Sequence, residues 1–405
     1  MPRFPLLASL TRHRLTVLLL VVQVACTCAI ACNVALMIAG RVASMRQSSG
    51  VAEEQLVMID STAMGRQDNP LARHQADLAA LRAIPGVKAA AAVDALPFNG
   101  DNWSNGIATA PGSPAHLAAT AFDGTPGELQ TLGLQLVEGR DFRSDEYLPV
   151  DSGHDWAGID RVSVVIVTRA LARRLFPGRD PLGRSIYPGD HPVRIVGVVD
   201  HLLRPDLESG GDGNEDSTLF PMLPDTRDVT YVLRTAPALR GHVLKQAMRT
   251  LQRLDGERIL DHARSFARLR ADYFRHDRTM LGLLLAAALG LLLVTAVGIA
   301  GLASFWVQQR RRSIGIRRAV GATRRDIRRY FQAENALIVA GGIVLGSVLA
   351  YALNLALMTR YELPRLPWFY LPAGALALWG LGQLAVLGPA LRAAAVPPVV
   401  ATRAA

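Results

Sequence analysis

A dense cluster of arginine lies between two apolar segments in the last third of the sequence. The stretch QQRRRSIGIRRAVGATRRDIRRYF, from Gln308 to Phe331, holds nine arginines and a single acidic residue, Asp326. Guanidinium groups at this density suit three kinds of partner: the phosphates of a nucleic acid, anionic lipid headgroups, or an acidic surface on another protein. The composition of the stretch alone leaves these three alternatives open.

Residues typical of catalysis and metal binding are scattered along the chain. The nine histidines form no HExxH motif and no cluster with cysteine, and the sequence has no Gly-x-Ser-x-Gly nucleophile elbow. The stretch GRDPLGRS, from Gly178 to Ser185, has the spacing of a phosphate-binding loop, but Arg184 replaces the lysine and Pro181 interrupts it. We interpret it as a turn between a helix and a strand. The sequence therefore predicts no catalytic residue, no metal site and no cofactor bound by this chain.

Long uncharged segments make the chain unusually apolar, and half of its 405 residues are hydrophobic. Apolar runs of about 18 residues or more predict transmembrane helices. Four such runs are present, at residues 15–40, 280–307, 336–358 and 368–391. The first is too long for the apolar part of a cleaved signal peptide, so we interpret it as an uncleaved signal anchor. It contains all three cysteines, so the segment that follows it is built without disulfides.

The distribution of charge orients these predicted helices. Residues 42–278 carry a net charge of −4, whereas the rest of the chain carries +14, so nucleic-acid binding by residues 42–278 has no electrostatic support. Arginines gather in the tail 1–14 and between the second and third apolar runs. The positive-inside rule places both regions, with the tail 392–405, in the cytoplasm. Residues 42–278 and the short loop 359–367 then lie outside.

The large segment 42–278 has the pattern of a mixed α+β domain. Short runs rich in β-branched residues predict strands at 54–60, 161–167 and 192–199. A helix is predicted at 168–176, where Thr168 can serve as the N-cap. A last predicted helix, DHARSFARLRADYFRHDR, leads directly into the second apolar run, so we expect a nearly continuous helical connection to the membrane.

The arginine-rich segment, residues 308–335, has the start and stop signals of two helices. Gly321 is a natural residue after a helix C-terminus, because glycine accepts positive φ. Thr323 and Asp326 then have the spacing of a capping box at the start of a second helix that continues into the third apolar run. An apolar stripe is predicted along both helices, at Ile316, Val320, Ile327 and Phe331. Since both ends are fixed at the membrane, a DNA-binding helix-turn-helix is a poor interpretation.

These residues resemble the signature of the MacB/FtsX-type ABC transporter permeases, which reads roughly R-x-x-E-I-G-I-R-R-A-L-G-A-x-x-x-D-I followed by a glutamate. The matching positions are Arg310, Ile314, Gly315, Ile316, Arg317, Ala319, Gly321, Ala322, Asp326 and Glu334. Shorter stretches resemble the periplasmic domain and C-terminal tail of the family, so the resemblance covers nearly the whole chain. Two positions depart from it: Ser313 stands where the family usually has glutamate, and Pro397 replaces a common aspartate.

The resemblance implies a permease subunit of an ABC transporter in the bacterial inner membrane. It implies that residues 308–335 dock onto a separate cytoplasmic ATPase, which holds ATP and Mg²⁺, through the matching positions with Arg318 and Thr323. ATP hydrolysis would then move the MacB-like periplasmic domain, residues 42–278, for export or extraction of a substrate. Cytoplasmic parts of the sequence hold no Walker lysine motif.

The family also implies further partners. Permeases of this kind work in pairs, and a periplasmic adaptor with an outer-membrane duct can take part. The G-x-x-x-G spacing of Gly342 and Gly346 marks a candidate dimer contact in the third apolar run. Ser313 leaves open an alternative function, that of a non-transporting membrane scaffold or sensor that regulates a periplasmic enzyme.

Overall fold

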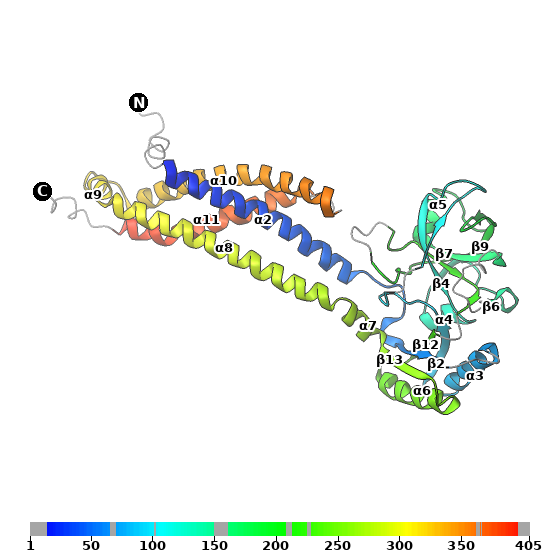
Figure 1. Cartoon of the computed structure of the whole chain (residues 1–405). Helices are drawn as coiled ribbons and strands as arrows, with labels where there is room; N and C mark the ends of the chain where they lie inside the picture. The colour runs from blue at the N-terminus through cyan, green and yellow to red at the C-terminus, as the bar shows by residue number, and fades with distance from the viewer. Residues whose placement is uncertain are drawn as a thin grey trace. The chain divides into compact units, whose positions relative to one another are not determined.

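The computed structural model describes residues 14–64, 70–100, 103–149, 161–207, 213–224, 228–361, 365 and 367–395. Most of the predicted tails 1–14 and 392–405, with Pro397 and part of the loop 359–367, lie outside these described residues. The chain divides into two compact units (Figure 1). A helical unit comprises Met1–Ala43 and Asp277–Ala405, and a globular unit comprises Ser44–His276.

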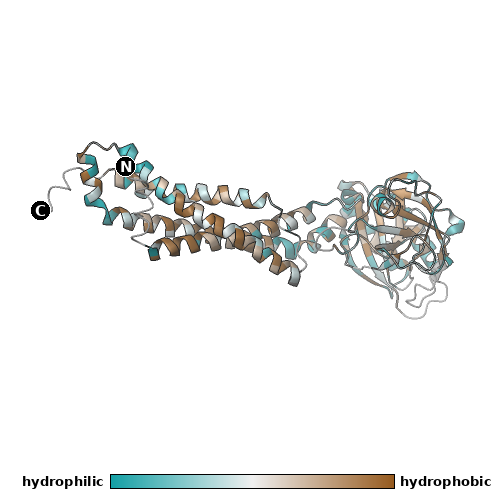
Figure 2. Cartoon of the chain, turned by 90° about the horizontal axis from the view of Figure 1, so that it is seen from above, coloured by the Kyte–Doolittle hydropathy of each residue, from teal (hydrophilic) through white to brown (hydrophobic). Residues whose placement is uncertain are grey.

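The helical unit holds the four predicted membrane helices. They are α2 (Arg14–Arg46), α8 (Arg275–Gln309), α10 (Arg324–Tyr361) and α11 (Tyr370–Ala394), and a short helix, α9 (Arg311–Ala319), lies between α8 and α10. All four long helices are apolar and long enough to cross a bilayer, as Figure 2 shows by their hydrophobic colour. Only 11% of the most apolar stretch of α8 is buried, so most of its apolar side chains face away from the helical unit.

Side chains of all five helices share one core. It includes Leu20 of α2, Trp306 of α8, Ile314 of α9, Phe331 of α10 and Val386 of α11. A few polar residues in the bundle are paired, as a lipid environment requires. Thr27 of α2 and Thr295 of α8 share a hydrogen bond of 2.7 Å, and Asn33 donates to the carbonyl of Ala350 in α10 at 3.1 Å.

The first sheet of the globular unit is antiparallel, in the order β13-β1-β12-β2. Its strands are β1 (Leu56–Thr62), β2 (Val87–Val93), β12 (Asp228–Thr235) and β13 (Ile259–Ser265). Helices α3 (Pro70–Arg82) and α6 (Arg240–Leu254) pack on one face of this sheet through apolar residues such as Leu81 and Val243. The helix α7 (Phe266–Tyr273) follows β13 directly.

The second sheet is mixed, with the order β3-β4-β10-β7-β9-β5 and with β8 paired to β9. Its strands are β3 (Ser104–Ile107), β4 (Leu117–Asp123), β5 (Leu136–Gly139), β7 (Val164–Thr168), β8 (Ser185–Ile186), β9 (Val193–Val199) and β10 (Ser217–Phe220). Helix α5 (Arg169–Leu175) connects the parallel strands β7 and β9. The remaining elements are α4 (Glu128–Leu132), the two-residue strands β6 (Leu148–Pro149) and β11 (Met222–Leu223), and three short 3-10 helices. The fold class predicted from sequence is confirmed.

The stretch that resembles a phosphate-binding loop is a turn between α5 and β8. Gly178 and Gly183 take positive φ values of 68° and 74°, and Arg184 donates to the carbonyl of Asp180 at 2.7 Å. The guanidinium of Arg184 also lies over the ring of Phe176, 5.4 Å from its centroid. The predicted turn between a helix and a strand is confirmed, and Arg184 stabilises it.

Helix α4 begins with a fully buried carboxyl group, Glu128, whose Oε1 has no hydrogen-bond partner among the described residues. Burial, with the neighbouring carboxylates of Asp94 and Asp141, raises the pKa of Glu128 well above its ordinary value. Because the pKa of Glu128 is raised in the folded state, protonation of this carboxyl favours folding. This contribution to the free energy of unfolding is complete below the unfolded-state pKa of about 4.3 and is lost as pH rises through the folded-state pKa.

We therefore expect Glu128→Gln to raise the Tm of the globular unit at pH 8 by about 2–4 °C and to have a much smaller effect at pH 4. Thermal unfolding of the full chain in detergent at the two pH values measures this difference. The exposed Glu138→Gln is the matched control and should change neither value. An equal gain at both pH values would show that the charge of Glu128 is not its cause.

Candidate coupling site

The arginine-rich segment forms two helices joined by a tight turn. Helix α9 ends at Ala319, and Gly321 follows with φ of 107°. The amide of Gly321 donates to Arg318 O at 3.2 Å, and that of Ala322 donates to Arg317 O at 3.0 Å, which is the hydrogen-bond pattern of a Schellman motif. The segment therefore reverses direction at Gly321, where a side chain would be strained.

Helix α10 starts at Arg324 with the predicted capping box. The amide of Asp326 donates to Thr323 Oγ1 at 3.2 Å, and the amide of Thr323 donates to Asp326 Oδ2 at 3.0 Å. From this cap α10 continues without interruption to Tyr361, so the segment and the third apolar run are one helix. A force applied to the turn would act directly on the axis of that helix.

Arg310 is turned into the helical bundle, where it pairs with Glu334 of α10. Its Nη1 lies 3.1 Å from Oε1 and 3.0 Å from Oε2 of this carboxylate, and the Glu334 side chain is only 2% exposed. The neighbouring Asn335 donates to the carbonyl of Gly382 in α11 at 3.0 Å. Because breaking a buried ion pair leaves an uncompensated charge, Arg310 fixes the α8–α9 junction on α10. The structure thus places this predicted docking residue inside the bundle.

The predicted apolar stripe is wrong for two of its four residues. Ile327 and Phe331 are buried in the bundle core, together with Ile314. Ile316 and Val320 lie on the other side of α9, where their side chains are 50% and 84% exposed. The sequence spacing could not distinguish the two faces, because which side of α9 meets the bundle depends on its connection to α8.

The exposed side of the segment is apolar at its centre and basic around it. Six exposed arginines surround Ile316 and Val320 in sequence: Arg311, Arg312, Arg317, Arg324, Arg325 and Arg329. The guanidinium of Arg317 lies over the Tyr330 ring, 5.0 Å from its centroid. Ser313 is exposed, whereas Gly315 is buried. We name this surface the α9 face.

Gly342 and Gly346 of α10 contact α2 of the same chain. A Cβ added at Gly342 would lie 2.7 Å from Val24 Cβ, and one added at Gly346 would lie 2.5 Å from Cys28 Cβ. The close helix approach that the G-x-x-x-G spacing permits is therefore made within one chain. A dimer contact at these two glycines would require α2 to be displaced.

Arg270 of α7 joins several parts of the globular unit, and the sequence analysis missed it. Its Nη1 pairs with the carboxylate of Glu53, while Nη2 donates to Met45 O at 2.9 Å and to Gln47 O at 2.6 Å. The guanidinium also lies 5.2 Å from the centroid of the Phe98 ring. Met45 O belongs to the last turn of α2, where carbonyls lack helical partners. Arg270 therefore attaches the end of α2 to α7, the element that precedes α8.

A second ion pair joins the same two helices within the helical unit. Arg41 of α2 pairs with Asp277 in the first turn of α8. Both side chains are about 30% exposed, so this pair contributes little stability by itself. Its position nevertheless supports the alignment of α2 with α8 that Thr27 and Thr295 also establish.

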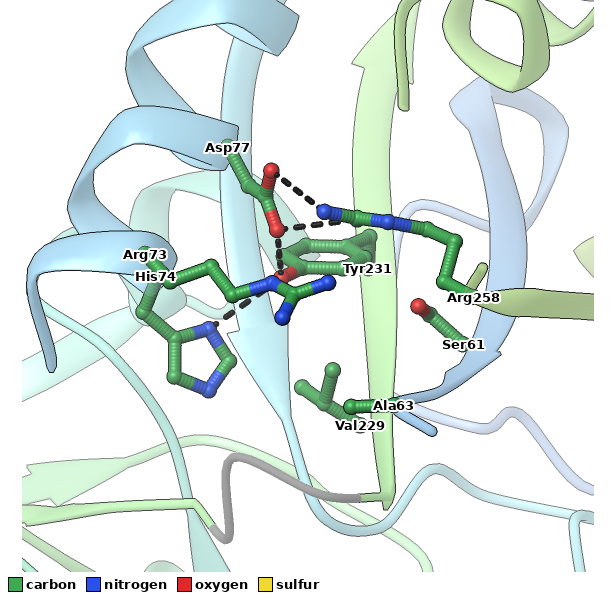
Figure 3. A pocket seen from close by; sticks show the side chains of 8 residues that line it. All are labelled: Ser61, Ala63, Arg73, His74, Asp77, Val229, Tyr231 and Arg258. Carbon is green, nitrogen blue, oxygen red and sulfur yellow. Dashed lines mark hydrogen bonds and ion pairs between the residues drawn. The ribbon is translucent and has the colours of Figure 1, made fainter. Parts of the chain in front are cut away.

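A buried polar cluster in the first sheet resembles a binding site but is closed (Figure 3). Asp77 of α3 accepts two hydrogen bonds of 2.9 Å from Arg258 and one of 2.7 Å from Tyr231. His74 Nδ1 lies 3.3 Å from the Tyr231 hydroxyl. Burial, with the Asp77 carboxylate, raises the pKa of Tyr231. The cavity of about 10 Å³ has room for no more than one water, so this cluster is structural.

Two protein families match the chain. Residues 20–251 match the MacB-like periplasmic core domain, and residues 285–398 match the FtsX-like permease C-terminal family. The pyoverdine export ATP-binding/permease protein PvdT of Pseudomonas syringae pv. tomato is 30% identical over 223 residues, which are 52% of this chain and 33% of that protein. The macrolide export ATP-binding/permease protein MacB of Nitrobacter winogradskyi is 27% identical over 278 residues, which are 64% of this chain and 42% of that protein.

The chain thus spans about a third to two fifths of the length of these curated relatives. Among solved structures, the periplasmic region of MacB from Actinobacillus actinomycetemcomitans is similar, with 14% sequence identity and a TM-score of 0.33. The similarity covers 54% of this chain and 92% of that structure.

The contact of Gly346 with α2 gives a prediction with a nearby control. Gly346→Ala should lower the Tm of the chain in detergent, because the new methyl group meets Cys28 and the backbone of Ala25. We expect this overpacking to reduce the free energy of unfolding by about 1–3 kcal/mol. Gly341→Ala adds the same methyl group where, apart from the adjoining backbone of α10, no atom lies within 4 Å, and it should leave the Tm unchanged or slightly higher. Equal Tm values for the two variants would contradict the close packing of α10 on α2.

Proposed function

This chain belongs to the MacB/FtsX-type family of ABC transporter permeases, and from that premise we propose that it couples a cytoplasmic ABC ATPase to its periplasmic domain. The chain is a multi-pass protein of the inner membrane. In the proposed orientation both termini and the α9 face lie in the cytoplasm, and the globular unit lies in the periplasm, in agreement with the distribution of arginine.

The single observation that carries the proposal is the composition and anchoring of the α9 face. Exposed Ile316 and Val320 offer an apolar centre, and the surrounding arginines suit a partner with an acidic rim. A lipid surface alone requires the positive charge but not the Schellman turn and capping box that fix the backbone. The ATPase that docks here would hold ATP and Mg²⁺, so this chain contributes no group to hydrolysis.

The coupling path that we propose follows contacts between helices. Movement of α9 would act on α10 through the turn at Gly321 and through the ion pair of Arg310 with Glu334. The close contact of Gly342 and Gly346 with α2 would pass this movement to α2. At the end of α2, Arg270 connects the chain to α7. Mechanotransmission of this kind needs no path for substrate through the four helices.

The proposed substrate process is export or extraction from the periplasm or the inner membrane. The names of the two curated relatives, for pyoverdine export and macrolide export, support export as the class of activity. We propose that two permease chains act together with the ATPase, and that a periplasmic adaptor and an outer-membrane duct complete the assembly. Membrane lipid would surround the apolar outer faces of the helices.

One observation favours the alternative function of a non-transporting scaffold or sensor. Ser313 is exposed on α9, at a position where the family usually carries glutamate, so an acidic contact to the ATPase is replaced by a neutral one. If this chain were a scaffold, an ATPase variant that cannot hydrolyse ATP would still support its function in cells. Loss of function with that variant would favour coupling instead.

Docking at the α9 face predicts the effect of charge reversal. The double substitution Arg317→Glu and Arg324→Glu, at two exposed arginines of this face, should reduce co-purification of the ABC ATPase at least about tenfold, because it places like charges opposite the proposed acidic rim. Arg392→Glu, an exposed arginine near the end of α11, is the matched control and should not affect the complex. An undiminished complex with the double variant would rule out docking through this face.

The position of Arg270 predicts a variant that binds the ATPase but transmits poorly. Arg270→Gln should leave ATPase co-purification intact and abolish the ATP-dependent change in distance between spin labels attached at residue 88 of the two paired permeases. Lys88 is exposed and far in sequence from this contact, and the native cysteines would first be replaced. Glu53→Gln, which removes the carboxylate partner, should have the same effect in a weaker form. A full distance change in Arg270→Gln would exclude this residue from the path.

A further inference from the structure

A broad groove opens in the globular unit between the start of α6 and the strand β13, which Figure 1 shows beside each other. Its volume is about 770 Å³, within the range of ligand-binding clefts and far larger than the closed cavity beside Asp77. Val57, Leu244, Ala263 and Ala267 form its apolar part. Neither the coupling path nor the buried polar cluster uses this groove.

One wall of the groove is an edge strand with an unused side. Among the described residues, β13 pairs with β1 alone, from Val57 opposite Ser265 to Thr62 opposite Ile259. The pairing is irregular between Met58 and Asp60, and His262 on the opposing strand has a positive φ of 46°. At this bulge the amide of His262 donates to Asp261 Oδ1 at 2.7 Å. Away from the bulge, the outer side of β13 presents backbone N–H and C=O groups that another extended chain can pair with.

The start of this edge strand is held firmly in place. Arg258, which directly precedes β13, is 4% exposed and donates two hydrogen bonds to Asp77 of α3. The same guanidinium lies 3.7 Å from the carboxylate of Asp255 through its Nε. A strand fixed in this way loses little conformational entropy when a partner adds to it, so the closed polar cluster preorganises the groove.

The polar part of the groove is strongly basic. Arg240, Arg264 and Arg268 line it with a single acidic residue, Asp272. Arg268 lies 3.9 Å from Asp272 and is 74% exposed, and Arg240 lies 3.5 Å from Glu54. Arg264 Nε is buried and has no hydrogen-bond partner among the described residues.

We infer that this groove binds an acidic, extended polypeptide segment of a partner protein, which adds to the first sheet as a strand beside β13. Alternate side chains of such a segment point to opposite sides, so one set can pack on Leu244 and Ala263 beside Arg240 while the other reaches Arg264. An anionic lipid headgroup satisfies the arginines as well, but it leaves the backbone of β13 unpaired. The inference does not depend on transport, because it concerns binding by the globular unit.

Binding of a synthetic probe to the full chain in detergent tests the inference. The probe is a fluorescein-labelled peptide of alternating Glu and Val, and fluorescence anisotropy gives its Kd. The double substitution Arg240→Gln and Arg268→Gln should raise the Kd about tenfold, since each exposed ion pair contributes modestly. Arg253→Gln, an exposed arginine of α6 outside the groove, is the matched control and should leave the Kd unchanged. Thermal unfolding checks that both variants remain folded.

Two further probes separate strand addition from simple charge attraction. A peptide of alternating Glu and Pro has the same charge but lacks the N–H groups of a strand, so it should bind much more weakly. Mixed micelles that contain phosphatidylglycerol should not compete with the Glu-Val probe for the wild-type chain. Equal binding of the two peptides, competition by the lipid-containing micelles, or no binding of the Glu-Val probe would each overturn the inference.

Discussion

Close packing of α2 against its neighbours is the contact on which the helical unit depends. Gly342 and Gly346 let α10 approach α2 so closely that the added Cβ atoms of alanine would overlap with it. Gly374 of α11 meets Cys32 of α2 in the same way. In lipid, association of helices gains little from apolar burial, because the surrounding acyl chains are equally apolar. Small residues and paired polar groups must hold α2 in place instead.

Because α2 is packed so closely, the few polar contacts of the bundle also restrain its movement. Thr27 connects α2 to α8, and Asn33 connects it to α10, so α2 cannot slide along either neighbour without losing a hydrogen bond in an apolar environment. The ion pair of Arg310 with Glu334 adds the same restraint at the α8–α9 junction. Helices restrained in this way move together, which is the property that a coupling subunit requires.

The sequence was sufficient for most features that depend on local patterns, although residues 261–265 of the last helix predicted in the globular unit belong to strand β13. Apolar length predicted four spans, and the positions of Gly321, Thr323 and Asp326 predicted the turn and the capping box, because these motifs involve residues close in the chain. Contacts between residues that are far apart in the chain could not be predicted from the sequence. The partners of Arg310 and Arg270 lie 24 and more than 200 residues away, and no local pattern indicates them. The same limit explains why Ile316 and Val320 were grouped with the buried residues of α10.

Arginine serves two different purposes in this chain, and its surroundings distinguish them. Arg310 and Arg258 pair with the buried carboxylates of Glu334 and Asp77, so they fix elements in place. Arginines of the α9 face are exposed around two apolar side chains, an arrangement that fits recognition of another protein. Ser313 lies on that exposed surface and not in the core, so the change from glutamate alters what the face presents while the fold of α9 is preserved. The departure from the family pattern therefore changes an exposed position of the α9 face and leaves the architecture of the helices unaltered.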